Sequence, residues 1–344
     1  MVNQSENRLD QLLHALTGIQ AIVIVLHNDP DPDAIASAVG LRTLLRYYDV
    51  LSEIQYQGRI GRASNRALVE YLDHPMIPLI TQPSLPTIYV DTQQGAGNAP
   101  LGVEPPALAV FDHHPWRMES ARAAFADVRT IGATATMMTQ YLRAANVPIL
   151  PQLATALYYG IKTDTLDLER MTTRHDVTAY RFLEKLIDLQ GLKQIQNAQV
   201  SADYFHNAHT ALQAARLYDN LLISSLGNMP YPDLAAEMAD WLMRFDGADW
   251  VVCCGISGDK VYLSVRAHPP RGGADELVRA IVAQRGSGGG HATMAGGQVP
   301  LTDDVPHDLM HNLLKNALDY LQITMPVEQG QKLLNFGQSH ECSA

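Results

Sequence analysis

Residues 27–33 read HNDPDPD, with an aspartate at every second position and a proline between each pair. Proline restricts the backbone, so the carboxylates are held in a limited set of directions. The segment directly follows the apolar run AIVIVL at residues 21–26, which is typical of a strand buried on both faces. Clustered negative charge at the end of a buried strand is unfavourable unless a counter-charge is present.

Acidic and imidazole side chains also follow two other apolar runs. TIYV at residues 87–90 is followed by Asp91, and ALAVF at 107–111 is followed by DHH at 112–114. A further aspartate, Asp164, stands in GIKTDT after a helical stretch. In an open parallel sheet the carboxyl ends of the strands lie along one edge, where ligands bind. We therefore predict that these side chains lie together.

The mixture of carboxylates and imidazoles predicts a divalent-metal site. Oxygen and nitrogen ligands together suit Mn²⁺, Zn²⁺ or Fe²⁺ better than Ca²⁺, and the ligands are numerous enough for two ions that support phosphoryl hydrolysis. Taken singly, each residue has a structural alternative. Asp33 could cap the helix that follows it, and Asp112 could belong to a turn. Their shared position after strands favours the metal site, to which we do not assign Asp29.

The elements that must position these residues indicate an α/β fold in two domains. A chain of 344 residues is too long for one ordinary domain. Short apolar runs alternate with helical patterns up to about residue 190, which predicts a mostly parallel sheet flanked by helices. Beyond it, the runs 249–256 and 260–267 are separated by SGD, a hairpin signal. We predict a catalytic domain at 1–190, a linker helix at 191–215, a smaller α+β domain at 216–326 and a polar tail at 327–344.

Composition narrows the class of protein. The net charge is −11, which argues against a broad basic surface for long duplex nucleic acid. Three cysteines, two of them adjacent, cannot form a disulfide framework. The first residues lack the pattern of a signal peptide, and we find no apolar run of membrane-spanning length. We therefore expect a cytoplasmic protein that does not bind membranes.

Read together, the motifs resemble a known family. HNDPDPDAIASA, VDT, DHHP and GIKTDT resemble, in this order, the four motifs of the DHH phosphoesterases. GSGGGHATMAGG at residues 286–297 is similar to the glycine-rich signature of the associated DHHA1 domain. The resemblance covers about residues 18 to 325 and is greatest to the bifunctional oligoribonuclease and pAp-phosphatase subgroup, the nanoRNases. GATAT at 132–136 also resembles that subgroup. Pro32 departs from the glycine of many relatives, but the carboxylates are intact.

The resemblance implies a role for each ligand. Asp91 would bridge two metal ions, for which Mn²⁺ is expected and Mg²⁺, Zn²⁺, Fe²⁺ or Co²⁺ are alternatives. A water activated by both ions would attack phosphorus, and His114 would lie beside the scissile phosphate. Asp33, Asp91 and His114 are thus the expected catalytic residues. The implied ligands are His27, Asp31 and Asp91 for one ion, and Asp33, Asp91, His113 and Asp164 for the other.

The second domain is expected to bind the substrate. Backbone N–H groups of a glycine-rich loop can form an anion-binding nest, and arginine offers a planar fork to phosphate. The resemblance implies a short oligoribonucleotide, a linear dinucleotide or pAp as the substrate, and a length limit of a few nucleotides because both ends are anchored. A homodimer is expected by resemblance alone. The candidate substrate-binding residues are Ser264, Arg266, Gly288, Gly289, Gly290 and His291.

Two alternative functions stay open. A manganese inorganic pyrophosphatase has a similar first motif, but its family carries an Arg-Lys-Lys cluster in the C-terminal domain that we do not find in this sequence. A non-catalytic nucleotide-binding regulator would have lost a metal ligand, whereas all the expected ligands are present. The choice among pAp, pApA, pGpG, oligoribonucleotides and a cyclic dinucleotide, the cleavage polarity and the native metal are not decided by the sequence.

Overall fold

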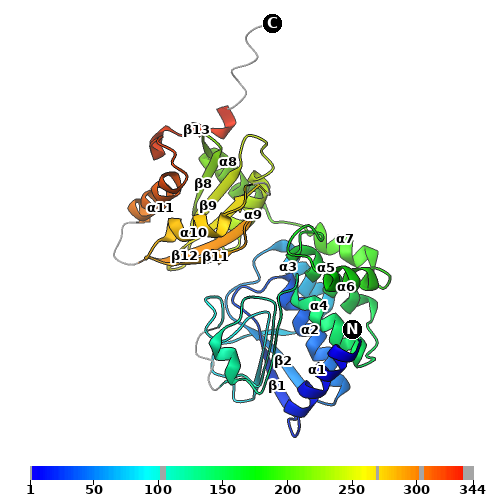
Figure 1. Cartoon of the computed structure of the whole chain (residues 1–344). Helices are drawn as coiled ribbons and strands as arrows, with labels where there is room; N and C mark the ends of the chain where they lie inside the picture. Colours follow the sequence, from blue (N-terminus) through cyan, green and yellow to red (C-terminus); the bar gives the residue numbers. More distant parts are fainter. Residues whose placement is uncertain (1, 101–105, 269–270, 302–305, 336–344) are drawn as a thin grey trace. The chain divides into compact units, whose positions relative to one another are not determined.

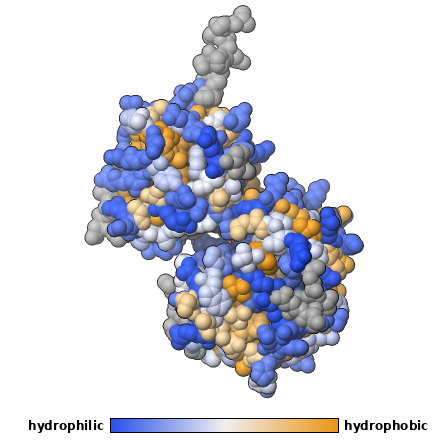
Figure 2. Space-filling view, in the orientation of Figure 1, coloured by the Kyte–Doolittle hydropathy of each residue, from blue (hydrophilic) through white to orange (hydrophobic). Residues whose placement is uncertain are grey.

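The chain consists of two compact units, Met1–Ala198 and Gln199–Ala344, each with its own sheet (Figure 1). Among the described residues, we find no helix with the length and apolar character that a bilayer crossing requires. Hydrophilic residues cover most of the visible face of each unit, with smaller groups of hydrophobic residues among them (Figure 2). The structure is a computed structural model that describes residues 2–100, 106–268, 271–301 and 306–335.

The N-terminal unit contains a six-stranded sheet in which every pair of neighbouring strands is parallel. The strand order is β3-β2-β1-β4-β5-β6. The apolar runs that predicted strands form the central strands β1, β4 and β5, whose residues are almost all buried. The strands are β1 (Ala21–Val25), β2 (Leu51–Tyr56), β3 (Met76–Pro78), β4 (Thr87–Val90), β5 (Ala109–Asp112) and β6 (Phe125–Val128).

The strand order reverses between β1 and β4. The chain runs outward from β1 through β2 to β3, returns to the centre as β4, and then runs the other way through β5 to β6. Right-handed connections place the two sets of crossovers on opposite faces of the sheet, so the carboxyl ends of β1 and β4 open into a crevice. Open α/β sheets bind their ligands at such a position.

One face of this sheet is covered by helices, and the other by the segments that connect β4 to β6. The buried residues of all seven helices belong to one core cluster with one face of the strands. A smaller core on the other face contains Val23, Val25, Tyr89 and Val110, with Ala99 and Ala107 from the β4–β5 connection. The helices are α1 (Val2–Ala15), α2 (Pro32–Tyr47), α3 (Ala63–Leu72), α4 (Thr134–Ala144), α5 (Pro151–Asp164), α6 (Arg174–Leu183) and α7 (Leu189–Gln196), with the 3₁₀ turn η1 (Met118–Arg122) between β5 and β6.

The C-terminal unit is a mixed, seven-stranded sheet with the order β11-β12-β10-β9-β8-β7-β13. Only β8 and β9 pair in parallel, and the expected hairpin is formed by β9 and β10. Helices α10 and α11 pack on one face, and α8 and α9 on the other. The elements are α8 (Ala202–Ala214), β7 (Arg216–Tyr218), β8 (Leu221–Asn228), α9 (Leu234–Leu242), β9 (Trp250–Ser257), β10 (Lys260–Ala267), α10 (Ala274–Val282), β11 (Ser287–Gly290), β12 (Met294–Pro300), α11 (Pro306–Tyr320), η2 (Val327–Gln329), β13 (Gln331–Lys332) and η3 (Leu333–Asn335).

Three local expectations differ from the structure. The single linker helix expected at 191–215 is two helices, α7 and α8, which end and begin on either side of the boundary between the units. The expected tail is part of the C-terminal sheet up to Lys332, because β13 pairs with β7; residues 336–344 lie outside the described part. The glycine-rich segment is not a loop, since Ser287–Gly290 pairs with β12 as an edge strand.

A buried aspartate connects the edge strand β6 to two helices. Asp127 has no exposed surface, and its carboxylate accepts hydrogen bonds from Arg8 of α1, from Arg129 (2.9 Å) and from the hydroxyl of Tyr141 on α4 (2.7 Å). Tyr141 also packs edge-on against Phe111 with ring centroids 5.2 Å apart. Because a buried carboxylate is stable only when it is paired, this group fixes α1 and α4 against the sheet.

Replacing Tyr141 with phenylalanine tests the contribution of this group. The ring contact with Phe111 would remain, while Asp127 would lose one donor. A hydrogen bond to a charged group contributes roughly 1.5–3 kcal/mol, so we expect the free energy of unfolding to fall by about that amount in denaturant titrations. Tyr47→Phe is the matched control, since the Tyr47 side chain is 53% exposed. Equal midpoints for the two variants would contradict the assignment.

Candidate metal centre

The predicted side chains lie together in the crevice between β1 and β4, although they come from five places in the chain. His27 follows β1, Asp31 and Asp33 begin α2, Asp91 follows β4, His113 and His114 follow β5, and Asp164 is the last residue of α5. All of them lie in the N-terminal unit. Their potential ligand atoms form three overlapping groups, within each of which the atoms lie within 4.8 Å of one another.

Two of these groups contain the ligands that the sequence analysis expected for two ions. In the first, Nε2 of His27 lies 3.7 Å from Oδ1 of Asp31 and 3.6 Å from Oδ2 of Asp91. The second, which contains Asp33, His113 and Asp164, meets the other oxygen of the same carboxylate, since Nε2 of His113 lies 3.5 Å from Oδ1 of Asp91. The structure therefore places Asp91 between the two groups, with one oxygen toward each.

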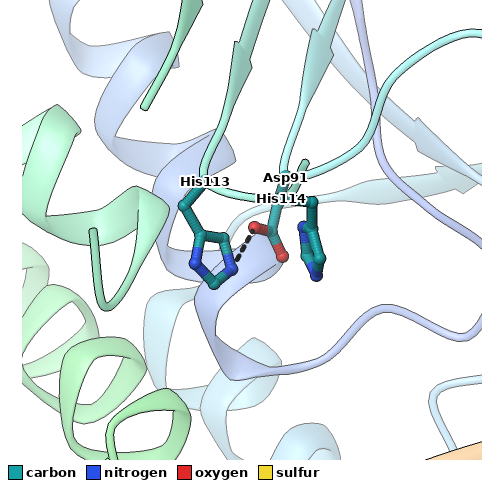
Figure 3. A group of neighbouring side chains, drawn as sticks. All are labelled: Asp91, His113 and His114. Carbon is teal, nitrogen blue, oxygen red and sulfur yellow. Dashed lines mark ion pairs between the residues drawn. The ribbon is translucent and has the colours of Figure 1, made fainter. Parts of the chain in front are cut away.

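In the second group, Nε2 of His113 faces three carboxylates. It lies 3.0 Å from Oδ2 of Asp164 and 4.0 Å from Oδ2 of Asp33, in addition to its contact with Asp91. Figure 3 shows the ring of His113 and the carboxylate of Asp91 directed at each other, with His114 on the other side of Asp91. The distance to Asp164 is that of a hydrogen bond or ion pair, whereas the distances to Asp91 and Asp33 are longer.

The hydrogen bonds of His27 and His113 leave Nε2 of each ring as the atom that faces the carboxylates. Nδ1 of His27 lies 2.8 Å from the carbonyl oxygen of Asn28, and Nδ1 of His113 lies 3.1 Å from that of Ile131. A carbonyl only accepts, so Nδ1 carries the proton and Nε2 of a neutral ring has the free lone pair, as in metal-ligating histidines. Nε2 of His113 is buried without a hydrogen-bond partner. A cation at this position would explain that atom, so the donor set fits divalent metal ions.

Asp91 turns the chain sharply at the end of β4. Its N–H still donates to the carbonyl of Phe111 (2.8 Å), which continues the pairing with β5. Its φ is 60°, in the left-handed region that residues other than glycine seldom adopt. Backbone strain of this kind is concentrated at functional sites. Here it turns the carboxylate into the crevice between the two groups.

The N-terminus of α4 anchors Asp33, a contact that the sequence analysis did not predict. Backbone N–H groups of Thr134 and Ala135 donate to the two carboxylate oxygens of Asp33, each at 2.7 Å. The residue before the helix, Ala133, has no side chain that could cap these N–H groups, so Asp33 replaces the cap. The hydroxyl of Thr134 also donates to Oδ1 of Asp91 (2.8 Å). The only signal for this role was the GATAT segment.

A second buried aspartate holds the start of α4 in place. Asp176 accepts from the N–H of Gly132 (2.9 Å) and from the hydroxyl of Thr136 (2.6 Å), and it also belongs to the capping box of α6. A Cβ at Gly132 would lie only 2.6 Å from a methyl carbon of Thr165 and 2.9 Å from Asp176. Glycine is therefore required where α4 approaches α6, and this contact orients the N–H groups that bind Asp33.

The electrostatics of the cluster require compensating positive charge. Burial, together with the negative charges of Asp91 and Asp164, raises the pKa of Asp33 well above its usual value. Burial alone lowers the pKa of His113, but its contacts with Asp164 and Asp91 outweigh this effect and raise that pKa well above normal. The raised pKa values favour proton binding at Asp33 and His113 when no metal is bound. Divalent ions would replace these protons, because metal ligands must be deprotonated.

Asp112 contacts the ring of His114. The sequence analysis had left a turn as an alternative explanation for this residue. Its buried carboxylate lies 2.8 Å from Nδ1 of His114 and accepts from Nε2 of Gln93 (2.7 Å). Burial lowers the pKa of His114, but the hydrogen bond to Asp112 outweighs it and raises that pKa. Asp112 is not in any of the ligand groups of the described residues. It holds His114 through Nδ1, while His114 itself belongs to a ligand group with Asp91 and His113.

Asp29 lies beside the cluster but is used elsewhere. Its Oδ1 accepts from the backbone N–H of Arg59 at 2.7 Å, and its φ is 56°. A Cβ at Gly58 would lie 2.4 Å from the same oxygen, so this carboxylate is packed against the chain that follows β2. Asp29 belongs to none of the ligand groups found among the described residues.

The candidate substrate-binding residues lie on one sheet of the C-terminal unit. Ser264 and Arg266 are both buried on β10 and share a face of the sheet, because side chains alternate along a strand. The guanidinium of Arg266 donates to the hydroxyl of Ser264 (2.7 Å) and pairs with Asp240 of α9. Ser264 lies in one row with Gly296 of β12 and Gly289 of β11. Ser264, the partner of Arg266, therefore lies beside glycines of β11 and β12, which have no side chain to cover the backbone.

The glycines of this segment differ in their surroundings. Cβ atoms at Gly288 and Gly297 would lie 3.3 and 2.9 Å from valine side chains of α10, so both permit close helix packing. At Gly289 no atom lies within 4 Å of an added Cβ. The face of the sheet opposite to α10 is therefore open at this residue. Gly290 has a φ of 149°, and His291 begins the turn to β12, where its N–H donates to the carbonyl of Met294 (2.7 Å).

Metal-binding stoichiometry tests the two-group arrangement. We expect the chain to bind two Mn²⁺ ions in equilibrium dialysis. Asp91→Ala should lose most binding at both positions, because only Asp91 faces both groups, whereas Asp164→Ala should lose one ion. Asp29→Ala is the matched control and should keep both ions, since Asp29 contacts backbone instead. Loss of both ions in Asp29→Ala, or of none in Asp91→Ala, would contradict the assignment.

Similar proteins support the same fold. An uncharacterised protein of Methanocaldococcus jannaschii is 32% identical over 284 residues, which are 81% of this chain and 58% of that protein. A probable manganese-dependent inorganic pyrophosphatase of Enterococcus faecalis is 27% identical over 177 residues, 49% of this chain and 57% of that one. This chain thus spans less than two thirds of either relative. The crystal structure of an exopolyphosphatase-related protein from Bacteroides fragilis matches with a TM-score of 0.63 at 15% identity, over 91% of this chain and 96% of that one.

The match to a family covers the part of the chain that builds the centre. Residues 21–161 match the DHH family, N-terminal domain. The matched range includes β1, β4 and β5 with the histidines and aspartates that follow them, and Asp164 stands three residues beyond it. The DHH segment itself supplies Asp112, His113 and His114, which the structure assigns to two different tasks. On these grounds, residues 21–161 of this chain form a domain that matches the DHH family, N-terminal domain.

Proposed function

We propose that this protein is a metal-dependent phosphodiesterase and phosphatase that hydrolyses short oligoribonucleotides, linear dinucleotides or pAp. The observation that supports this most is the carboxylate of Asp91, which faces His27 of one ligand group with one oxygen and His113 of the other group with its second oxygen. Beside it lies His114, which is held by Asp112. Divalent ions bound there would supply Lewis-acid charge for the oxygens of a phosphoryl group. Mn²⁺ is the proposed ion, since it suits mixed carboxylate and imidazole ligands.

The side chains around the centre have separate tasks in this proposal. His27, Asp31 and Asp91 would hold one ion, and Asp33, Asp91, His113 and Asp164 the other. His114 would act on the substrate, because Asp112 engages Nδ1 and leaves Nε2 for a phosphoryl or leaving-group oxygen. The raised pKa of His114 favours the protonated ring, which can donate a hydrogen bond or a proton to the departing nucleoside oxygen.

Short substrates suit the charge of the molecule. With a net charge of −11, the protein repels a long polyanion, and this repulsion is strongest at low ionic strength. In the C-terminal unit, Ser264, Arg266 and the neighbouring glycines are the proposed contacts for a phosphate or base away from the reacting group. Because Asp240 already pairs with Arg266, we expect its contribution to affinity to be smaller than that of an unpaired arginine.

Inorganic pyrophosphate is the second candidate substrate. The similarity to a probable manganese-dependent inorganic pyrophosphatase favours it, and the same ligand set could serve both substrates. Parallel assays of a dinucleotide, pAp and pyrophosphate with Mn²⁺ distinguish the two functions. The proposal requires the nucleotide substrates to have the highest kcat/KM. A preference for pyrophosphate would replace it with the second candidate.

The kinetic role of His114 can be separated from metal binding. We expect His114→Ala to lower kcat on a dinucleotide by about 10²–10⁴-fold, the usual contribution of a general acid, with KM nearly unchanged. Asp112→Asn should also lower kcat, because Nδ1 loses its charged partner. Both variants should retain two Mn²⁺ ions in dialysis. If either variant lost a metal ion, the residue would belong to the ligand set instead.

A length series tests the substrate class. We expect kcat/KM with Mn²⁺ to be highest for single-stranded ribonucleotides of about two to four residues and to decrease steeply toward a twenty-mer, since added phosphates gain repulsion from the acidic surface. The measurement is product formation across the series at two salt concentrations. Rates that stayed constant or rose with length would indicate an exonuclease of long strands and would rule out the proposed substrate class.

A further inference from the structure

A pocket of about 450 Å³ adjoins the metal centre on the side of the β4–β5 and β5–β6 connections. Asp112 and His114 form part of its wall, and Thr92, the residue after Asp91, forms another part. The pocket therefore begins where His114 would meet a reacting phosphate. Its volume lies within the range of sites for small molecules. The proposed function does not use this space, because none of the candidate metal ligands is among the residues that line it.

The wall of the pocket is fixed by one buried glutamine. Nε2 of Gln93 donates to Asp112 (2.7 Å) and to the carbonyl of Pro115 (3.0 Å). Its Oε1 accepts from the N–H of Arg117 and from the hydroxyl of Ser120, each at 2.8 Å. The amide thus ties the segment after DHHP to the carboxylate that holds His114. A pocket that is preformed in this way binds with less loss of conformational entropy.

Two large apolar side chains of this segment are exposed at the pocket. Trp116 is 51% exposed and Met118 is 77% exposed, although both line the same cavity. Exposed apolar groups gathered at one site mark binding surfaces. A nucleobase can stack on an aromatic ring whatever its sequence identity. Thioether sulfur also contacts aromatic rings favourably.

The rest of the lining supplies polar contacts for a nucleoside. Asn98 and Arg117 lie at the pocket with the two apolar side chains. The Asn98 side-chain oxygen accepts from the hydroxyl of Thr92 (3.2 Å), which turns the amide nitrogen toward other acceptors. Arg117 donates to the carbonyl of Gly95 (3.2 Å) and carries a positive charge. Inorganic phosphate or pyrophosphate would make no use of an indole and a thioether.

We propose that this pocket binds the aromatic base of the nucleotide next to the reacting phosphate, with Trp116 as the stacking surface. The inference rests on the proposed function for the position of that phosphate. It extends the proposal by assigning a substrate class: a compound with an aromatic base beside its phosphoester, in preference to inorganic polyphosphates or sugar phosphates. Gln93 acts as a positioning residue, because it contacts the pocket wall and not the ligand.

Equilibrium binding of two probes tests the pocket directly. AMP and ribose 5-phosphate share the sugar phosphate and differ in the base. With the full chain and Mn²⁺, we expect calorimetry to give a Kd for AMP roughly tenfold lower or more, since stacking on an aromatic side chain contributes that much per base. Trp116→Ala should reduce the ratio of the two constants to about twofold or less, while Trp116→Phe, which keeps a ring, should retain most of it.

Controls separate the pocket from the fold and from the reaction. Trp241→Ala removes a tryptophan that is 40% exposed on α9 of the other unit and should leave the ratio unchanged. An unchanged ratio in Trp116→Ala would overturn the inference, as would an equal loss in Trp241→Ala. Hydrolysis of a 5′-phosphorylated dinucleotide is measured on the same samples. Turnover without base discrimination would refute the pocket alone, whereas discrimination without turnover would support the pocket and refute the proposed function.

Discussion

Repulsion among buried carboxylates is the constraint on which the rest of the N-terminal unit depends. Asp33 and Asp91 are almost completely buried, and Asp164 lies 3.0 Å from the same imidazole that faces both of them. Burying such charges without compensation costs several kcal/mol or more for each. The structure supplies partial compensation through histidines, a threonine hydroxyl and backbone N–H groups, and it leaves Nε2 of His113 without a hydrogen-bond partner. The incomplete compensation is what makes the site suitable for cations.

The doubly wound sheet is the means by which these groups are brought together. Reversal of the strand order between β1 and β4 opens a crevice at their carboxyl ends. The helix-covered face then provides Asp164 at the end of α5 and the N-terminus of α4, whose dipole and free N–H groups favour the Asp33 carboxylate. The other face is covered by the connections to β5 and β6. Those connections form a pocket beside His114.

The three consecutive residues of the DHH segment have two different sets of contacts. His113 faces the carboxylate cluster, while Asp112 and His114 form a pair of their own. Strand geometry accounts for the difference, because Asp112 still belongs to β5 and pairs with β6, whereas the histidines follow the strand. Gln93 then links Asp112 to the segment that carries Trp116. One aspartate thus connects the orientation of His114 to the shape of the neighbouring pocket.

Much of this arrangement follows from the sequence alone. Apolar runs that end in aspartate or histidine determine both the strands and the edge at which their side chains meet, since parallel strands align their carboxyl ends. The side chains that follow the strands could therefore be expected at one edge, whereas the ligand set of His27, Asp31, Asp33, Asp91, His113 and Asp164 was implied by the resemblance in motifs. The alternation of elements likewise indicated the α/β class, and the break in pattern after about residue 190 indicated a second domain.

Tertiary structure decided the contacts that no local pattern records. Thr134 meets Asp33 across 101 positions of sequence, and only the packing of α4 against α2 brings them together. Gly132 looks like an ordinary turn residue until Asp176 and Thr165 are placed beside it. The glycine-rich segment became strand β11 because β12 offers a free edge, although its composition favours a loop. Spacing in the sequence determines which face a side chain occupies, but its partner depends on how distant elements pack.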